Sequence, residues 1–217
     1  MKLIIANWKM YLGVKDSVRL AKNIVAGKNQ VIVCPSFVAI PEVKKALGKG
    51  VKLGAQNVSW QESGALTGEV SAGMLVELGC RYVIVGHSER RRFLAESDFV
   101  VREKLKAVLA KKIIPILCVS DLSELKILNQ LVINDLIVAY EPVWAIGTGK
   151  TPTMEEIADM HKKIRARAGK SIKKLLVIYG GSVEEKNLKN ILALPEVDGV
   201  LIGGASTTLS SLKKILQ

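Results

Sequence analysis

Eight short runs of apolar, β-branched residues recur along the chain at intervals of about 28 residues, a usual length for one strand–helix unit. They are Lys2–Asn7, Gln30–Cys34, Val51–Gln56, Tyr82–His87, Ile113–Val119, Leu136–Glu141, Leu175–Gly180 and Gly199–Ile202. The runs lack strict apolar–polar alternation, which is typical of parallel strands that are covered on both faces. Between them lie helical patterns such as Asp98–Lys111 and Met154–Ala168, and Thr153 with Glu156 predicts a capping box before the second.

Eight strand–helix units fit either a closed (β/α)8 barrel or an open, doubly wound sheet. An open nucleotide-binding sheet should carry a glycine-rich fingerprint after its first strand, and Asn7-Trp8-Lys9-Met10 contains no glycine. Eight is also a number of strands that closes a barrel. We therefore expect one α/β domain over residues 1–217, a (β/α)8 barrel with some helices or loops trimmed, because 217 residues are few for this fold.

The chain is basic, with 32 Lys and Arg against 20 Asp and Glu and a formal net charge of +12. Its lysines are scattered, and no long basic tract, zinc finger or RNA-binding aromatic motif is present. We therefore expect a charged surface that attracts small anions. A nucleic-acid-binding protein remains an alternative, and it predicts Lys and Arg clustered on one surface.

The cysteines and the lengths of the apolar runs indicate the cellular compartment in which the protein is expected. Cys34, Cys80 and Cys118 form neither a CxxC pair nor a Cys/His cluster, so we expect three buried thiols, no disulfide and no metal site. The longest apolar run, Ile113–Val119, is far too short to span a membrane. The apolar stretch Leu3–Ala6 is too short for a signal peptide. These features favour a cytoplasmic protein without a membrane partner.

Reactive side chains fall at the carboxyl ends of the expected strands, where barrel enzymes carry their chemistry. Asn7 and Lys9 follow the first strand, His87 the fourth and Glu141 the sixth. The helix start after His87 and a nearby lysine favour a neutral imidazole, which can still donate a hydrogen bond to a carbonyl oxygen. Glu141 can act as a general base, although an ion pair with Lys or Arg is the structural alternative.

Two glycine turns and one stiff segment complete the set of candidate site features. Gly181-Ser182 and Gly203-Gly204 precede helices after the last two strands, where exposed backbone N–H groups bind phosphate. Residues Pro142–Pro152 have proline at both ends and a glycine-rich middle, which is typical of a lid that closes as a unit. For Glu89, Arg90 and Arg91, ion pairing around the barrel mouth is the favoured interpretation.

The chain resembles the triosephosphate isomerase family over nearly its whole length. The matching stretches are Ala6–Met10, Gly86–Arg91, Ala139–Lys150, Tyr179–Val183 and Asp198–Ser206. The resemblance implies that dihydroxyacetone phosphate and D-glyceraldehyde 3-phosphate are interconverted through an enediolate, in glycolysis and gluconeogenesis, without a metal or organic cofactor. By the same resemblance, the catalytic residues are His87, Glu141 and Lys9, and the substrate-binding residues are Asn7, Lys9, Gly147, Ser182, Gly203 and Gly204.

In these roles, Glu141 is the base that moves a proton between two substrate carbons, and His87 is the neutral electrophile. Lys9 counters negative charge, and the serine and glycines hold the phosphate. The loop Asn57–Glu69 resembles the family's interdigitating dimer loop, with Thr67 reaching toward the partner's active site. It implies a homodimer, and a higher oligomer remains possible.

The chain departs from the family in two places. After Cys118 the family usually continues with a Gly-Glu pair and a long helical excursion, whereas Ser120-Asp121 here soon leads into the next strand. One helix between strands five and six is therefore expected to be shortened or lost. Pro152 has no N–H to offer Tyr179 where relatives have alanine. We keep a catalytically silent phosphosugar-binding barrel as a second alternative, which predicts damage at Lys9, His87 or Glu141.

Overall fold

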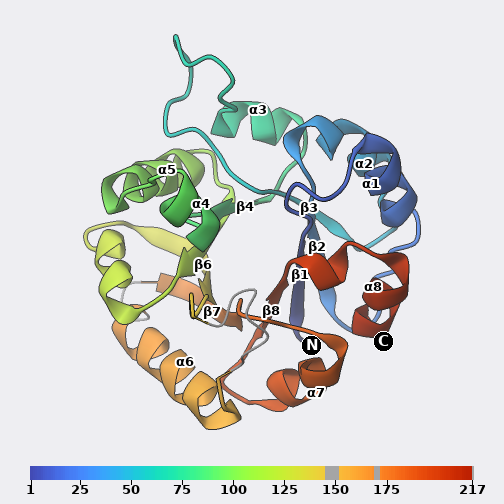
Figure 1. Ribbon diagram of the computed structural model, residues 1–217. Helices are drawn as coiled ribbons and strands as arrows, with labels where there is room; N and C mark the ends of the chain where they lie inside the picture. Colours follow the sequence, from blue (N-terminus) through green and yellow to red (C-terminus); the bar gives the residue numbers. More distant parts are fainter. Residues whose placement is uncertain (145–151, 169–171, 217) are drawn as a thin grey trace.

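The computed structural model describes residues 1–144, 152–168 and 172–216, and in it eight parallel strands close into a barrel in chain order (Figure 1). The strands are β1 (Leu3–Asn7), β2 (Gln30–Cys34), β3 (Lys52–Ala55), β4 (Tyr82–Val85), β5 (Ile114–Val119), β6 (Ile133–Tyr140), β7 (Ile172–Tyr179) and β8 (Gly199–Ile202). Closure occurs between β1 and β8, where Leu3 is the register partner of Gly199. The prediction of a barrel over an open sheet is confirmed.

Helices form an outer ring around the strands (Figure 1). The α-helices are α1 (Val14–Ala21), α2 (Ile40–Ala46), α3 (Ala72–Glu77), α4 (Ser88–Phe93), α5 (Asp98–Ala110), α6 (Met154–Ala168), α7 (Glu185–Ala193) and α8 (Leu209–Leu216), and the short 3-10 helices are η1 (Phe37–Ala39), η2 (Leu122–Leu128) and η4 (Gly204–Ser206). The capping box at α6 is confirmed. The N–H of Thr153 donates to the Glu156 carboxylate at 2.8 Å, and the N–H of Glu156 donates to the Thr153 hydroxyl at 3.2 Å.

Two predicted strand starts were wrong by three residues. β6 begins at Ile133 and β7 at Ile172, and these two residues are register partners. The polar residues Asn134, Asp135, Lys173 and Lys174 interrupt the apolar runs there, so periodicity alone placed the starts too late. Asn134, Lys173 and Lys174 are exposed, whereas Ile133 and Ile172, with which the two strands begin, are buried in the core, so pairing extends through a partly polar stretch.

Alternate residues of each strand build two apolar layers, because successive side chains point to opposite faces of a strand. Ile5, Ile32 and Ile116 fill the interior of the barrel. Ile4, Val33 and Leu117 belong to the layer between the strands and the helices. Both layers are closed to water, which fixes the strand ends firmly in place. No helix among the described residues is long and apolar enough to cross a bilayer.

Between β5 and β6, a stretch that is described throughout, the chain forms the 3-10 helix η2 and no α-helix. Leu125, Ile127 and Leu128 are buried there. The Arg102 guanidinium on α5 donates to the carbonyls of Ile127 and Asn129, each at 2.7 Å. The expected shortening of the barrel at this place is confirmed, and the trimmed turn is packed tightly against its neighbours.

Candidate active site

Glu141 and His87, which follow β6 and β4, are neighbours. The His87 Nε2 atom lies 3.2 Å from the Glu141 Oε1 atom, and the two residues are 7% and 1% exposed. These two atoms are not aligned for a hydrogen bond, and Oε1 has no hydrogen-bond partner within the described part of the chain. The other carboxylate oxygen, Oε2, accepts the backbone N–H of Ser88 at 2.9 Å. One oxygen is thus anchored and the other is held next to the imidazole.

His87 caps the N-terminus of α4 with its own ring. The backbone N–H of Glu89 donates to the His87 Nδ1 atom at 3.2 Å. In a neutral ring, Nδ1 therefore carries the lone pair and Nε2 the proton. This arrangement turns an N–H donor toward Glu141 and the neighbouring cavity, as the sequence-based role of His87 requires.

Lys9, just beyond β1, has a left-handed backbone with a φ of 48°. Its N–H donates to the Asn7 side-chain oxygen at 3.1 Å, and its carbonyl accepts the Gln56 amide at 2.8 Å. Its Nζ lies 2.5 Å from a Glu89 carboxylate oxygen. These contacts hold an unfavourable backbone conformation and direct the ammonium group.

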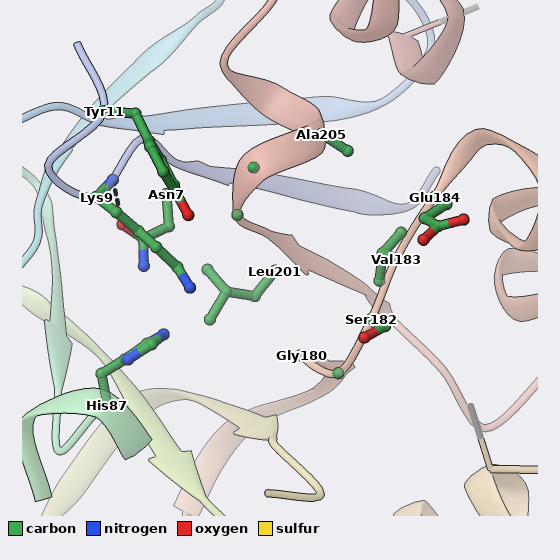
Figure 2. Close-up of a pocket in the computed structure, with 13 residues that line it drawn as sticks. Asn7, Lys9, Tyr11, His87, Gly180, Ser182, Val183, Glu184, Leu201 and Ala205 are labelled. Atoms are coloured by element: carbon green, nitrogen blue, oxygen red, sulfur yellow. Dashed lines mark hydrogen bonds between the residues drawn. The ribbon is translucent and has the colours of Figure 1, made fainter. Parts of the chain in front are cut away.

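A cavity of about 270 Å³ opens at the carboxyl ends of the strands. Its lining residues are Asn7, Lys9, Tyr11, His87, Gly180, Gly181, Ser182, Val183, Glu184, Leu201, Gly203, Gly204 and Ala205. Figure 2 shows the side chains of Lys9 and His87 extending into one space beside Leu201, with Gly180 and Ser182 across from them. The structure thus places six of the predicted site residues around one cavity: Asn7, Lys9, His87, Ser182, Gly203 and Gly204. Gly147 and most of the expected lid lie outside the described residues.

Glycine permits a close approach at two places around the cavity. A Cβ on Gly203 would lie 2.9 Å from the Lys9 Cε atom, and one on Gly180 would lie 3.0 Å from the Glu141 Cγ atom. These contacts are tighter than ordinary van der Waals contact, so a larger residue would displace the Lys9 or Glu141 side chain. The glycines therefore allow close approach, in addition to exposing backbone N–H groups.

Glu141 itself does not line the cavity; it is buried behind His87. Cys118 contacts it from β5. Burial first, then the negative charge of Glu141 and a hydrogen bond to it, raise the pKa of the Cys118 thiol well above its usual value. The thiol therefore stays protonated beside the carboxylate. In this structure the carboxylate is held at the Ser88 N–H group, outside the set of residues that line the cavity.

The predicted ion pairs around the barrel mouth are present. The Arg90 Nε atom lies 2.5 Å from Glu96, and the Arg91 Nη1 atom lies 2.8 Å from Asp98. Neither Arg90 nor Arg91 is among the residues that line the 270 Å³ cavity. Among the described residues, no group of three or more His, Cys, Asp or Glu side chains is arranged to hold a metal ion. All three cysteines are buried free thiols, as predicted.

Several residues that contribute to the candidate active site could not be identified from the sequence. Ser88 acts through its backbone N–H and Gln56 through its reach across two loops, and neither role leaves a residue-type signal. Tyr11 and Glu184 line the cavity beside residues that were predicted. The only hint was position, because Tyr11 lies two residues after Lys9, and Glu184 lies two residues after Ser182.

Comparison with known proteins agrees with the geometry. A family model described as triosephosphate isomerase matches residues 2–217. A triosephosphate isomerase of Moorella thermoacetica is 41% identical over 242 residues, which cover 99% of this chain and 97% of the relative. Those of Rhodopirellula baltica and Thermus thermophilus are 39% and 40% identical, with 99% of this chain and 96% and 97% of the relatives covered. The chain therefore belongs to the triosephosphate isomerase family.

Proposed function

We propose that this isomerase interconverts dihydroxyacetone phosphate and D-glyceraldehyde 3-phosphate, with Glu141 as the base, His87 as the electrophile and Lys9 as the cationic group. Membership of a family of isomerases that act on triose phosphates supports the reaction class. The observation that carries the residue assignment is the 3.2 Å approach of His87 Nε2 to Glu141 Oε1, beside a cavity that Lys9 lines.

The reaction moves two protons within the substrate, one between neighbouring carbons and one between the oxygens that they carry. Glu141 removes the proton from the carbon next to the carbonyl group, while the His87 Nε2–H donates a hydrogen bond to the carbonyl oxygen as it gains negative charge. The enediolate then takes this proton back from Glu141 on the neighbouring carbon, and the substrate's hydroxyl proton passes to the former carbonyl oxygen by way of the His87 Nε2 atom. Because both protons stay with the substrate, the enzyme ends unchanged and needs no external oxidant or reductant.

The cavity walls support binding of a small phosphorylated carbonyl compound. Backbone N–H groups around Ser182, Gly203 and Gly204 are suited to phosphate oxygens. The Lys9 ammonium extends into the same space and is held by Glu89. Gly147 belongs to this phosphate set by family resemblance. The motion that the mechanism needs is rotation of the Glu141 carboxylate from the Ser88 N–H toward the substrate.

The test is the Glu141→Ala variant in a coupled isomerase assay. We expect kcat to fall by about a hundredfold to ten-thousandfold, because a general base supplies about 10² to 10⁴. Binding of a non-reacting substrate analogue should change little. Glu103→Gln, which removes a half-buried carboxylate paired with Lys106 and remote from the cavity lining, is the matched control and should keep wild-type turnover. Near-normal turnover of Glu141→Ala contradicts the assignment of the base.

The same assay addresses the alternatives. A catalytically silent phosphosugar-binding barrel predicts wild-type binding without turnover, yet Lys9, His87 and Glu141 are all present and held around the site. A nucleic-acid-binding protein predicts tight duplex binding that weakens steeply with salt. A salt titration of DNA binding that shows no such dependence removes that alternative.

We also propose a homodimer formed through the loop 57–69, with Thr67 near the partner's active site. This segment projects beyond the ring of helices between β3 and α3 (Figure 1), and residues 60–69 are all exposed. A hollow of about 490 Å³ beside Lys9 and His87 is edged by exposed apolar side chains, among them Met10 and Phe93. A projecting loop and an open apolar hollow on one chain are suited to two-fold exchange between copies.

Solution mass tests the dimer. We expect twice the chain mass for the wild type and a monomer for Thr67→Arg, whose exposed position makes folding damage small. Ser210→Arg on the exposed side of α8 is the control and should stay dimeric. A monomeric wild type refutes the proposal, and a fourfold mass indicates a further interface. A place in glycolysis and gluconeogenesis in the cytoplasm accords with the reaction and with three reduced thiols.

A further inference from the structure

We propose that Glu124, on the shortened turn after β5, is a positioning residue that holds His87 in place through Arg91. The inference rests on the proposed function, because it assigns a task to the supports of the same site. Neither Glu124 nor Arg91 lines the cavity, so any effect on catalysis must pass through other residues.

Arg91 makes two hydrogen bonds to the backbone segment that carries His87. Its Nε donates to the carbonyl of Gly86 at 3.1 Å, and its backbone N–H donates to the carbonyl of His87 at 3.1 Å. Gly86 has a φ of 70°, a left-handed conformation that turns the chain sharply at the end of β4. The Arg91 side chain therefore holds the Gly86 carbonyl, while the bond from the Arg91 N–H belongs to the backbone of α4. Together they fix the backbone from which the His87 side chain extends.

Two carboxylates hold the guanidinium in turn. The Asp98 Oδ1 atom lies 2.8 Å from Arg91 Nη1, and the Glu124 Oε2 atom lies 3.9 Å from Arg91 Nε. The Arg91 side chain is only 15% exposed and that of Glu124 19%, so water screens the attraction weakly. Asp98 also faces Lys126 on η2, whereas Glu124 makes no other ion pair among the described residues.

Glu124 also connects Arg91 to the strand end that carries Glu141. The same Oε2 atom accepts the backbone N–H of Ser120 at 2.9 Å. Ser120 follows Val119, the last residue of β5, and the Val119 carbonyl accepts the N–H of Glu141 at 2.8 Å. One carboxylate thus links the strand ends that carry His87 and Glu141.

The shortened sequence explains why this task falls to Glu124. Asp121, which stands close to the end of β5, is occupied: its Oδ1 accepts the N–H and the hydroxyl of Ser123, each at 2.6 Å. The 3-10 turn that begins after Asp121 brings position 124 back over the strand end. Burial raises the pKa of Glu124, an effect that the Ser120 N–H and Arg91 oppose. A carboxylate is therefore kept in a place where burial disfavours its charge.

The expected consequence is a loss in kcat with little change in KM. A displacement of about 1 Å at a catalytic group can cost about a hundredfold in rate. Glu124 is one of two carboxylates on Arg91, so its loss should loosen His87 only partly, and we expect a decrease of about tenfold. Ser182, Gly203 and Gly204, which are proposed to bind the phosphate, follow β7 and β8 and stay in place, so KM should remain within about twofold.

Glu124→Gln is the test variant, because the amide oxygen can still accept the Ser120 N–H while the charge opposite Arg91 is removed. Glu103→Gln is the matched control on α5 and should leave kcat unchanged. An unchanged kcat in Glu124→Gln, or a rise in KM as large as the fall in kcat, overturns the proposal.

A double-mutant cycle separates positioning through Arg91 from general damage. We expect Glu124→Gln to lower kcat less than about twofold in an Arg91→Met background, since no cation remains opposite Glu124 there. An equal loss in both backgrounds refutes the proposed route.

A readout without turnover keeps this inference distinct from the proposed function. The chain has only two histidines, so the ring nitrogens of His87 can be assigned by NMR. We expect Glu124→Gln, but not Glu103→Gln, to shift the His87 ring signals. An inactive wild type contradicts the proposed function alone, whereas unshifted His87 signals contradict the positioning role alone.

Discussion

The second histidine, His161, gives a quantitative prediction about stability and pH. It lies within α6, is 0% exposed, and packs edge-on against Tyr140 with ring centroids 6.3 Å apart. Its Nδ1 atom is 3.4 Å from the Glu196 carbonyl oxygen, and its Nε2 atom has no partner within the described part of the chain. Burial lowers the pKa of His161 from 6.5 to about 4, and the Glu196 carbonyl offsets only part of this effect.

The sign and size of the change in the free energy of unfolding with pH follow from proton linkage. Below pH 6.5 the unfolded chain binds a proton at His161, whereas the folded chain does not until the pH approaches 4. The free energy of unfolding therefore falls as the pH drops through this window. At 1.36 kcal/mol for each pH unit, the full loss is about 3 kcal/mol, and about 2 kcal/mol of it is reached between pH 7.5 and pH 5.

Urea unfolding at pH 7.5 and pH 5 measures the effect, at one fixed protein concentration because an oligomer's stability depends on it. The comparison variant is His161→Gln, which has no ionisable group at this position. Its own free energy of unfolding should fall by about 2 kcal/mol less than that of the wild type over the same pH interval. Carboxylates titrate in both proteins, so their contribution cancels. Equal pH dependence in the two proteins refutes the reasoning.

Three further predictions concern the site and its supports. Tyr179→Phe should lower kcat less than about threefold, because Pro152 has no N–H to meet the tyrosine hydroxyl; a large loss of kcat in steady-state assays shows that another donor uses that hydroxyl. Gly203→Ala should raise KM about tenfold or more, since the added Cβ would lie 2.9 Å from the Lys9 Cε atom, and an unchanged KM contradicts this. Lys104→Met should lower the free energy of unfolding by about 3 kcal/mol in urea titrations, because Lys104, which is 4% exposed, pairs with the buried Glu96 carboxylate.

The sequence alone determined the order and number of the strands and the end of the barrel at which the candidate active site lies. Apolar runs covered on both faces are a local signal, and eight of them in series leave few architectures. The rule that reactive groups follow strand carboxyl ends then found Lys9, His87 and Glu141 without any knowledge of their contacts. Their placement around one site agrees with the sequence-based prediction.

Other features depended on contacts between residues far apart in the chain. The hydrogen bond that the Ser88 N–H donates to Glu141 and the pairing of Lys9 with Glu89 each join different strand ends. The extension of β6 is of the same kind, because it follows from pairing with β7 through polar residues. Periodicity reports which face of an element is apolar, but barrel closure and register decide which side chains meet. For that physical reason the sequence points to the candidate catalytic groups, while only the tertiary structure shows how each is held.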